Sequence, residues 1–213
     1  MEVRDGVYTY DLPWSFGGYS EPLSVHVIEA DGTTVLFGSG TAETVDDLVE
    51  NVGQHDVDVV FVEHGDVDHY GGVPRLREEW DIEVAAPAGD VALIEAESVE
   101  VDRQLEGGRS YWGIETISAP GHTPDNMSYR FEEVLVAGDT VCGSDSPFAA
   151  DDAWQGAFAP LQPDLNDDDQ QTLASISNLM DHEFEVVLTT HGQNALENGH
   201  GEIETLVDEI DVR

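Results

Sequence analysis

The sequence predicts an α/β fold built from two β-rich halves, each of which ends in helices. Two observations lead to this prediction. Short apolar runs rich in β-branched residues, typical of buried strands, recur along the chain, and segments with apolar residues at helical spacing follow them. Because 40% of the 213 residues are hydrophobic, the chain can bury a substantial core, and we expect a single domain over residues 1–213.

The first half contains four predicted strands, which are the apolar runs at 7–12, 23–30, 33–37 and 57–62. Asp31 and Gly32 separate the second strand from the third, and this dipeptide is typical of a tight hairpin turn. A helix is predicted where three apolar residues share one face and a glycine can end the helix: Val45, Leu48, Val52 and Gly53. A second helix is predicted over 90–97.

The second half contains predicted strands at 114–118, 134–137 and 186–189, and two amphipathic helices. The apolar faces of these helices carry Leu173, Ile176 and Leu179 in the first, and Ile203, Leu206, Val207 and Ile210 in the second. The acidic run 167–169 opens the first helix, where negative charge suits the helix dipole. We interpret this run as a solvated cap and not as a metal site.

The most informative motif is a cluster of four potential metal ligands directly after the strand at 57–62. His64, Asp66, Asp68 and His69 lie within six residues. Imidazole nitrogens and carboxylate oxygens are the donors that divalent metals bind in proteins, and a short polar turn can aim several of them at one point. Taken alone, the cluster is also compatible with a solvated turn, because this acidic chain carries aspartate throughout.

Three more predicted strands run into a potential ligand. The strand at 114–118 leads to His122, the strand at 134–137 leads to Asp139, and the strand at 186–189 leads to His191. In layered α/β folds, functional sites collect at strand ends, because the backbone is rigid on one side and the loops are free on the other. The repetition of the pattern favours the metal-site interpretation of all seven residues.

The chain resembles the metallo-β-lactamase fold superfamily in the order and spacing of its motifs: His64-x-Asp66-x-Asp68-His69, Pro-Gly-His122, Gly-Asp139 and His191-Gly. The matching region extends from the strand at 33–37 to His191. The resemblance implies a four-layer αββα sandwich and a metallohydrolase similar to glyoxalase II. The stretch from Leu36 to Gly40 resembles the early strand-to-turn segment of the family, but the acidic residue often found there is missing.

Position 66 departs from the family, whose first motif usually reads His-x-His-x-Asp-His. Asp66 stands where the second histidine is expected. That imidazole typically binds through Nδ1, which is bonded directly to Cγ, and an aspartate oxygen is bonded directly to Cγ as well. The distance from the backbone to the donor atom is therefore nearly the same in the two residues. The carboxylate oxygen is a harder, anionic donor, which shifts the metal preference of the site from zinc toward manganese or iron. We expect Asp66 to be a ligand, and the alternative is that its site is weak or empty.

The resemblance implies two divalent metal ions, for which we expect zinc, with iron or manganese as alternatives. Carried over residue by residue, the resemblance implies His64, Asp66 and His122 as ligands of one ion, Asp68, His69 and His191 as ligands of the other, and Asp139 as the bridge. Paired ions lower the pKa of a bridging water and supply a hydroxide nucleophile. Asp68 is the expected catalytic residue that orients this hydroxide and shuttles its proton. Thr123 is an expected support of the imidazoles by adjacency.

The charge of the chain indicates the salt concentration in which the protein works. Only seven basic residues, all of them arginine, accompany 46 acidic residues, and the formal net charge is −39. At molar salt the Debye length falls to about 3 Å, which screens the repulsion within such a surface. The composition resembles that of halophilic archaea, which keep molar salt in the cytoplasm. An acidic disordered chain is excluded, because 40% of the residues are hydrophobic and the apolar runs are periodic.

Other features of the sequence predict a cytoplasmic protein that binds neither membranes nor nucleic acids. The start of the chain lacks a basic region followed by an apolar stretch, and no apolar run approaches membrane-spanning length. The chain also lacks the basic patch that a polyanion would require. Cys142, the one cysteine, excludes an intramolecular disulfide, and we interpret it as a buried structural thiol. The sequence leaves the oligomeric state open.

Two aromatic segments are expected to form the substrate pocket. The first is a mobile loop over 13–19 and the second is a long connection over 142–166, and loops of this length in compact domains are often lids. Their aromatic residues are Trp14, Phe16 and Tyr19 in the first, and Phe148, Trp154 and Phe158 in the second. Aromatic side chains near a metal centre favour an apolar acyl substrate.

The predicted function is a metal-dependent hydrolase that uses a metal-activated hydroxide on an ester, thioester or lactone of a small molecule. One alternative is a mononuclear iron enzyme similar to the persulfide dioxygenases of the same fold, which would use His64, His122 and Asp139. Another is a non-catalytic metal-binding member. The expected residue type stands at six of the seven ligand positions, which argues against the non-catalytic alternative.

Overall fold

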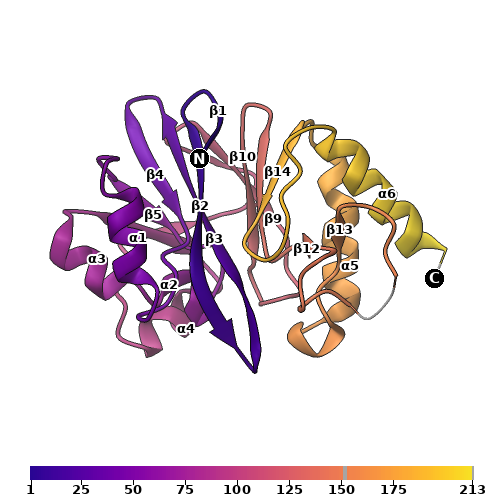
Figure 1. Ribbon diagram of the computed structural model, residues 1–213, viewed down its shortest axis with the longest axis horizontal. Coiled ribbons are helices and arrows are strands. Elements are labelled where there is room, and N and C mark those ends of the chain that lie inside the picture. Colours follow the sequence, from indigo (N-terminus) through magenta and orange to yellow (C-terminus); the bar gives the residue numbers. More distant parts are fainter. Residues whose placement is uncertain (151–152, 213) are drawn as a thin grey trace.

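A computed structural model describes residues 1–150 and 153–212 (Figure 1). Two β-sheets lie face to face in the middle of the molecule, and helices cover the outer side of each sheet. Helices α1 to α4 lie on one side in Figure 1, and α5 and α6 lie on the other. The predicted four-layer αββα sandwich is therefore confirmed.

The first sheet has seven strands in sequence order: β1 (Glu2–Arg4), β2 (Val7–Phe16), β3 (Tyr19–Ala30), β4 (Thr33–Phe37), β5 (Val59–Phe61), β6 (Glu83–Pro87) and β7 (Arg103–Leu105). Strands β1 to β4 pair antiparallel, and β4 to β7 pair parallel. Parallel neighbours need crossover connections, which here contain the helices α1 (Val45–Val52), α2 (Val67–Tyr70), α3 (Val73–Glu79) and α4 (Val91–Ala96).

The second sheet has five strands in the order β14-β11-β10-β9-β8. Their bounds are β8 (Ser110–Tyr111), β9 (Ile114–Ser118), β10 (Met127–Phe131), β11 (Val134–Gly138) and β14 (Val186–Thr189). A separate two-stranded ribbon follows this region, made of β12 (Cys142–Gly143) and β13 (Phe158–Ala159). The remaining helices are η1 (Pro163–Leu165), α5 (Asp169–Asn178), η2 (Leu179–Asp181) and α6 (Gly199–Asp211).

Alternation of side chains along each strand divides the apolar residues among three layers of core. In β4, Val35 and Phe37 face the opposite sheet, whereas Leu36 faces the helices. Phe37, Phe61 and Tyr129 pack together between the sheets, with ring centroids 5.2–5.4 Å apart. The Tyr129 hydroxyl donates a hydrogen bond to the Val62 carbonyl, 3.2 Å away, and so joins the second sheet to the chain just before the ligand motif.

The topology of the second sheet brings three of the predicted ligand positions to one edge. Strands β9 and β11 are both antiparallel to β10, and β14 is parallel to β11. The three strands therefore run in the same direction, and His122, Asp139 and His191 follow their carboxyl ends. The chain leaving β5 of the first sheet reaches the same edge, since His64 and His122 are in contact there.

The predicted strands and helices are found in the structure, with one informative difference at the segment 13–19. We expected a mobile loop, but β2 and β3 pair through this region up to the Phe16–Tyr19 pair. Gly17 and Gly18 alone form the turn, with φ of 59° and 92°, values that favour glycine. The aromatic residues of this segment therefore sit on a β-hairpin. Elements that were not expected from the sequence are the strands β1, β6, β7, β8, β10, β12 and β13 and the helices α2 and α3.

Candidate metal centre

The His64–His69 segment is a tight turn that is held by the end of β4. After β5 the chain enters α2, and the backbone carbonyl of His69 accepts hydrogen bonds from the backbone N–H (2.8 Å) and the hydroxyl (3.1 Å) of Ser39. Gly72 follows this turn, and a Cβ atom there would lie 2.1 Å from the Ser39 carbonyl oxygen. The close approach therefore requires glycine, and the segment Leu36 to Gly40 sets the position of the turn.

The loop that carries His122 is fixed in a similar way against α5. Gly121 has φ of 131°, and a Cβ atom there would lie 2.3 Å from the Thr172 backbone nitrogen. Its carbonyl accepts a 2.8 Å hydrogen bond from the Asp168 N–H, and Asp168 in turn caps α5, where its side chain accepts from the Gln171 N–H. The predicted capping role of the acidic run is thereby confirmed.

The first group of converging donors contains His64, Asp66 and His122. The two Nε2 atoms of the histidines are 3.2 Å apart, and Asp66 Oδ2 lies 3.6 Å from His64 Nε2 and 3.1 Å from His122 Nε2. Donors that bind one ion at 2.0–2.2 Å in tetrahedral geometry lie about 3.4 Å apart. The spacing therefore fits a single metal ion, and the carboxylate at position 66 points to the same place as the two imidazoles.

The second group contains Asp68, His69 and His191. Asp68 Oδ2 lies 3.2 Å from His191 Nε2 and 3.9 Å from His69 Nε2. The two imidazole rings are buried, and the Asp68 side chain is 13% exposed. These three residues come from both sheets, so the second group assembles only when the sandwich has formed.

Asp139 lies between the two groups. Its Oδ2 is 3.9 Å from His64 Nε2, 3.7 Å from His122 Nε2 and 3.5 Å from His191 Nε2. Its Oδ1 is 3.6 Å from His69 Nε2. One carboxylate thus reaches the imidazoles of both groups, as a bridging ligand must.

Unpaired buried atoms at this point fit bound cations. Asp139 Oδ1 and His69 Nε2 are buried and have no hydrogen-bond partner within residues 1–150 and 153–212. A buried polar atom without a partner costs free energy, which a metal ion would offset. The donor set of four imidazoles and three carboxylates suits zinc, iron or manganese.

Three of the four imidazoles are oriented from behind by a side chain on Nδ1. His69 Nδ1 lies 2.9 Å from Glu63 Oε2, His191 Nδ1 lies 3.1 Å from Glu21 Oε1, and His122 Nδ1 lies 3.3 Å from Asn166 Oδ1. An acceptor on Nδ1 holds the proton there and leaves the Nε2 lone pair for a metal. Glu63, Glu21 and Asn166 were not predicted from the sequence, because two of the three lie far along the chain from the histidines that they orient.

Glu63 places a carboxylate beside the stretch from Leu36 to Gly40, which lacks the acidic residue that the family often has there. The side chain of Glu63 is 1% exposed, and both of its carboxylate oxygens would lie 3.6 Å from a Cβ atom at Gly38. The neighbouring strand end therefore supplies a carboxylate to the space beside Gly38, directly behind His69.

Replacing Glu63 by glutamine should weaken metal binding without changing the shape of the site. The amide keeps an acceptor for His69 but removes the negative charge, and loss of such an outer partner typically lowers metal affinity about 10–100-fold. A competition titration with a chromophoric chelator measures this change. Glu50→Gln on the exposed face of α1 removes the same charge far from the site and serves as the control. Equal affinity in the two variants would contradict the proposed role.

Asp90 ties two of the ligand loops together from a buried position. Its carboxylate accepts hydrogen bonds from the Gly65 N–H at 2.9 Å, the Asp125 N–H at 3.0 Å and the Thr123 hydroxyl. Gly65 follows His64, and Thr123 follows His122. We expected Thr123 to support an imidazole directly, but it donates to Asp90 and so acts on the loop.

Burial and neighbouring charges shift the pKa values of the side chains in the centre. Burial lowers the pKa of His69, but the carboxylates of Glu63, Asp139 and Asp68 outweigh it and raise that pKa well above the ordinary value. Burial also opposes ionisation of Asp139, yet His191 and His69 hold its pKa well below the ordinary value. A metal ion that binds here must displace protons, because imidazole binds metals in its neutral form.

A cavity of about 280 Å³ opens onto the donors. Asp66, Asp68, His122, Asp139 and His191 form its floor, and apolar side chains form its walls: Trp14, Phe16, Val67, Phe148, Leu161 and Leu165. Both segments expected to form the pocket contribute, but not all of their aromatic residues do. Phe158 is fully buried in the core beneath the second sheet.

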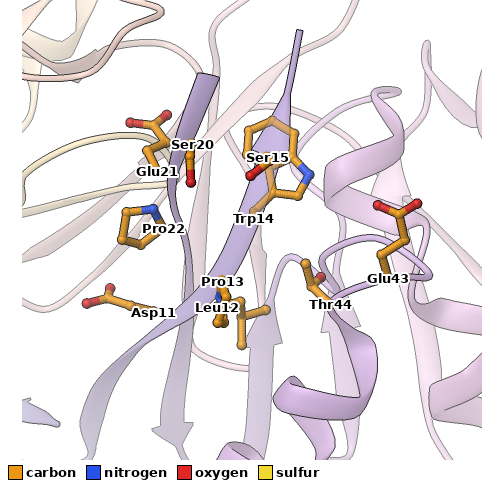
Figure 2. Close-up of a pocket in the computed structure, with 10 residues that line it drawn as sticks. All are labelled: Asp11, Leu12, Pro13, Trp14, Ser15, Ser20, Glu21, Pro22, Glu43 and Thr44. Atoms are coloured by element: carbon orange, nitrogen blue, oxygen red, sulfur yellow. The ribbon is translucent and has the colours of Figure 1, made fainter. Parts of the chain in front are cut away.

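A larger hollow of about 580 Å³ shares Trp14 with this cavity in its lining (Figure 2). Figure 2 shows it between the β2–β3 hairpin, which carries Asp11 and Glu21, and the segment before α1, which carries Glu43 and Thr44. None of the seven residues whose donor atoms converge lines it. The smaller cavity is therefore the candidate active site, although the hollow is larger.

Cys142 has no place among the converging donors. The thiol is buried, and burial raises its pKa, so that it stays protonated. Its neighbours are the carbonyl oxygens of Ala159 and Pro160. The cysteine is a structural thiol of the β12–β13 ribbon.

Comparison with known proteins agrees with this geometry. The family model described as the metallo-beta-lactamase superfamily matches residues 21–191. Among solved structures, a metallo-beta-lactamase from Pontibacter korlensis superimposes with a TM-score of 0.77 at 17% identity, covering 100% of this chain and 98% of that one. The mono-zinc form of the metallo-beta-lactamase FIM-1 from Pseudomonas aeruginosa gives 0.72 at 15% identity, with 100% and 95% covered. At these identities the likeness shows the fold alone.

Curated relatives match over a shorter region. The hydroxyacylglutathione hydrolase of Brucella ovis is 30% identical over 91 residues, which are 40% of this chain and 34% of that enzyme. The enzyme of the same name from Brucella abortus gives the same values. The chain thus spans about a third of the length of these relatives. In the described part of the chain, none of the helices has the length and apolar composition of a membrane span.

Proposed function

The chain belongs to the metallo-beta-lactamase superfamily of metallohydrolases, and from that premise we propose that it holds two divalent metal ions and hydrolyses an ester, thioester or lactone of a small molecule. The observation that carries this proposal is the pair of donor groups that share Asp139. His64, Asp66 and His122 form the first group. Asp68, His69 and His191 form the second.

The residues of the chain have distinct roles in this proposal. A bound pair of divalent ions supplies Lewis acidity and lowers the pKa of a water molecule. Asp68 lies on the cavity floor with its side chain 13% exposed, so it can accept the proton of the attacking water and pass it on. Glu63 and Glu21 hold the imidazoles of His69 and His191 in the orientation that leaves Nε2 available.

Thioesters are supported as one of the substrate classes by the curated relatives. Their name states that they hydrolyse hydroxyacylglutathione, which is a thioester. The match covers about a third of those enzymes, so it supports the bond type and not the whole substrate. The chemistry proposed above acts equally on esters and lactones, because all three present a carbonyl carbon to the nucleophile.

The binuclear proposal is favoured over the iron dioxygenase alternative by the second donor group. A mononuclear site needs His64, His122 and Asp139 only. Here Asp68 and His191 also converge, and the carboxylate of Glu21, whose side chain is 9% exposed, orients His191. Such support of a histidine outside the first group is expected for a second metal site and is unnecessary for a single one.

We also propose that the protein works in a cytoplasm of high salt concentration. Each of the six arginines in the described part of the chain is already paired with a carboxylate. Most of the 46 acidic side chains therefore have no cationic partner, and dissolved cations must screen them.

Metal analysis combined with hydrolysis assays tests the proposed function. The protein is purified in molar potassium chloride without chelator, and bound metals are measured by mass spectrometry. We expect about two equivalents of divalent metal and turnover of at least one substrate in a panel of uncharged esters, thioesters and lactones, which chelation abolishes and added metal restores. A single equivalent of iron, with sulfite formation from a persulfide, would establish the dioxygenase alternative instead.

A further inference from the structure

Resting on the proposed hydrolase function, we infer that the active site selects substrates with an apolar acyl group and no negative charge, and discriminates against anionic thioesters. Two independent features of the cavity carry this inference. The first is the sign of the charges in and behind the site. The second is the aromatic wall that faces the converging donors.

No arginine or lysine side chain lines the cavity, as judged from residues 1–150 and 153–212. The arginines of this part of the chain are instead engaged elsewhere on the surface, as in the pair of Arg77 with Asp102 and the pair of Arg130 with Glu115. An anionic substrate group is recognised most strongly by an arginine or lysine at the site, because only such a charge compensates its desolvation. The cavity offers no such group.

Carboxylates surround the cavity in excess of what two divalent ions would neutralise. Three carboxylates lie among the converging donors, and Glu63 and Glu21 stand directly behind them. These five negative charges exceed the four positive charges of two divalent ions. Glu63 is buried and the Glu21 side chain is only 9% exposed, so dissolved salt screens these two charges little, and they repel an approaching anion even when the centre is loaded.

The wall of the cavity fits an apolar group of the size of a phenyl ring. Phe148 lies against His191, with ring centroids 5.0 Å apart, and Trp14 lies 5.4 Å from the same ring. Phe16 stacks on Trp14 with an interplanar angle of 3°. Phe16 and Val67 at the rim are 58% and 55% exposed, so that apolar surface is left for a substrate to cover.

A matched pair of thioesters tests the charge selection. Both carry the phenylacetyl group, one on uncharged N-acetylcysteamine and the other on anionic glutathione. We expect kcat/KM for the uncharged thioester to exceed that for the anionic one by at least about tenfold at a fixed salt concentration. Equal values, or a preference for the glutathione thioester, would overturn the inference.

Substitutions at Val67 connect this preference to the rim of the cavity. Val67→Arg places a cation beside the entrance and should raise kcat/KM for the glutathione thioester, so that the ratio between the two substrates falls. Val67→Gln has similar reach without charge and should leave that ratio unchanged. Metal content is measured in both variants, because Val67 lies between Asp66 and Asp68. A ratio that is the same in both variants would show that charge at the entrance does not set the preference.

The aromatic wall is tested with acyl groups of different size on the same uncharged thiol. The phenylacetyl thioester should have a higher kcat/KM than the acetyl thioester. Phe148→Leu should reduce this ratio about tenfold, because the smaller side chain covers less of the phenyl ring of the substrate. The substitution keeps an apolar residue at a buried position, so the fold should be retained. An unchanged preference would contradict the role of Phe148.

A binding measurement separates this inference from the hydrolase proposal. Tryptophan fluorescence of the metal-loaded protein, in which metal binding has displaced the protons of the imidazoles, is titrated with phenylacetamide, which is uncharged, and with phenylmethanesulfonate, which is anionic and binds metals weakly. We expect the amide to bind more tightly than the anion. Trp14→Leu should remove the ligand-dependent change in fluorescence, because Trp14 lines the cavity. If neither thioester is hydrolysed but the amide binds selectively, the hydrolase proposal fails and the charge selection stands. Equal binding of amide and anion would overturn the charge selection whatever the activity.

Discussion

Replacement of Asp66 by alanine is expected to remove about one equivalent of bound metal and to lower kcat/KM by more than about 100-fold. Loss of a residue that only hydrogen-bonds to a metal ligand typically lowers metal affinity or activity by up to about 100-fold. Loss of a ligand itself should have a larger effect. Asp66 Oδ2 lies 3.1 Å from His122 Nε2 and 3.6 Å from His64 Nε2, so the variant leaves two imidazoles and the shared Asp139 for that ion. Metal content by mass spectrometry and steady-state kinetics measure the two effects.

Two further variants sharpen this experiment. Asp66→His restores the more common family motif and should keep both metal equivalents, with the preference shifted back toward zinc because a softer nitrogen donor replaces an oxygen. Asp56→Ala removes an exposed aspartate elsewhere and controls for the change of net charge. Unchanged metal content and activity in Asp66→Ala would refute the assignment of Asp66 as a ligand.

Dilution of salt is expected to unfold the protein reversibly. Lowering the ionic strength from 1 M to 0.1 M lengthens the Debye length from about 3 Å to about 10 Å, so many more of the 46 acidic side chains repel one another. A folded domain has a stability of only about 5–15 kcal/mol, and repulsion summed over many pairs can offset much of it. Bound metal should protect the fold in part, by mass action.

Circular dichroism melts between 0.1 and about 3 M potassium chloride, with and without chelator, measure this effect. The double variant Glu204→Gln and Asp208→Asn removes two exposed carboxylates one turn apart on α6 and should make the melting temperature less dependent on salt. A melting temperature that does not change with salt would contradict the halophilic interpretation and would leave the metal site unaffected.

The sequence by itself determined the layers of this protein and the identity of the residues that converge. Alternating apolar residues such as Val35, Leu36 and Phe37 predicted a strand with two buried faces, and the structure places them in two different cores. The positions that converge could be predicted because they follow the ends of strands. Strand ends are local features, and parallel strands bring them to one edge whatever the details of packing.

Only the tertiary structure decided how those residues are supported and what surrounds them. Glu21 orients His191 from 170 positions away, and Asn166 orients His122 from 44. The segment 13–19 reads locally as a glycine-rich loop, yet its pairing across the hairpin makes it a wall of the cavity. Such contacts depend on the meeting of two sheets and on the register of strand pairing. These contacts leave no periodic pattern in the sequence, because each of them joins residues that are far apart along the chain and meet only in the folded protein.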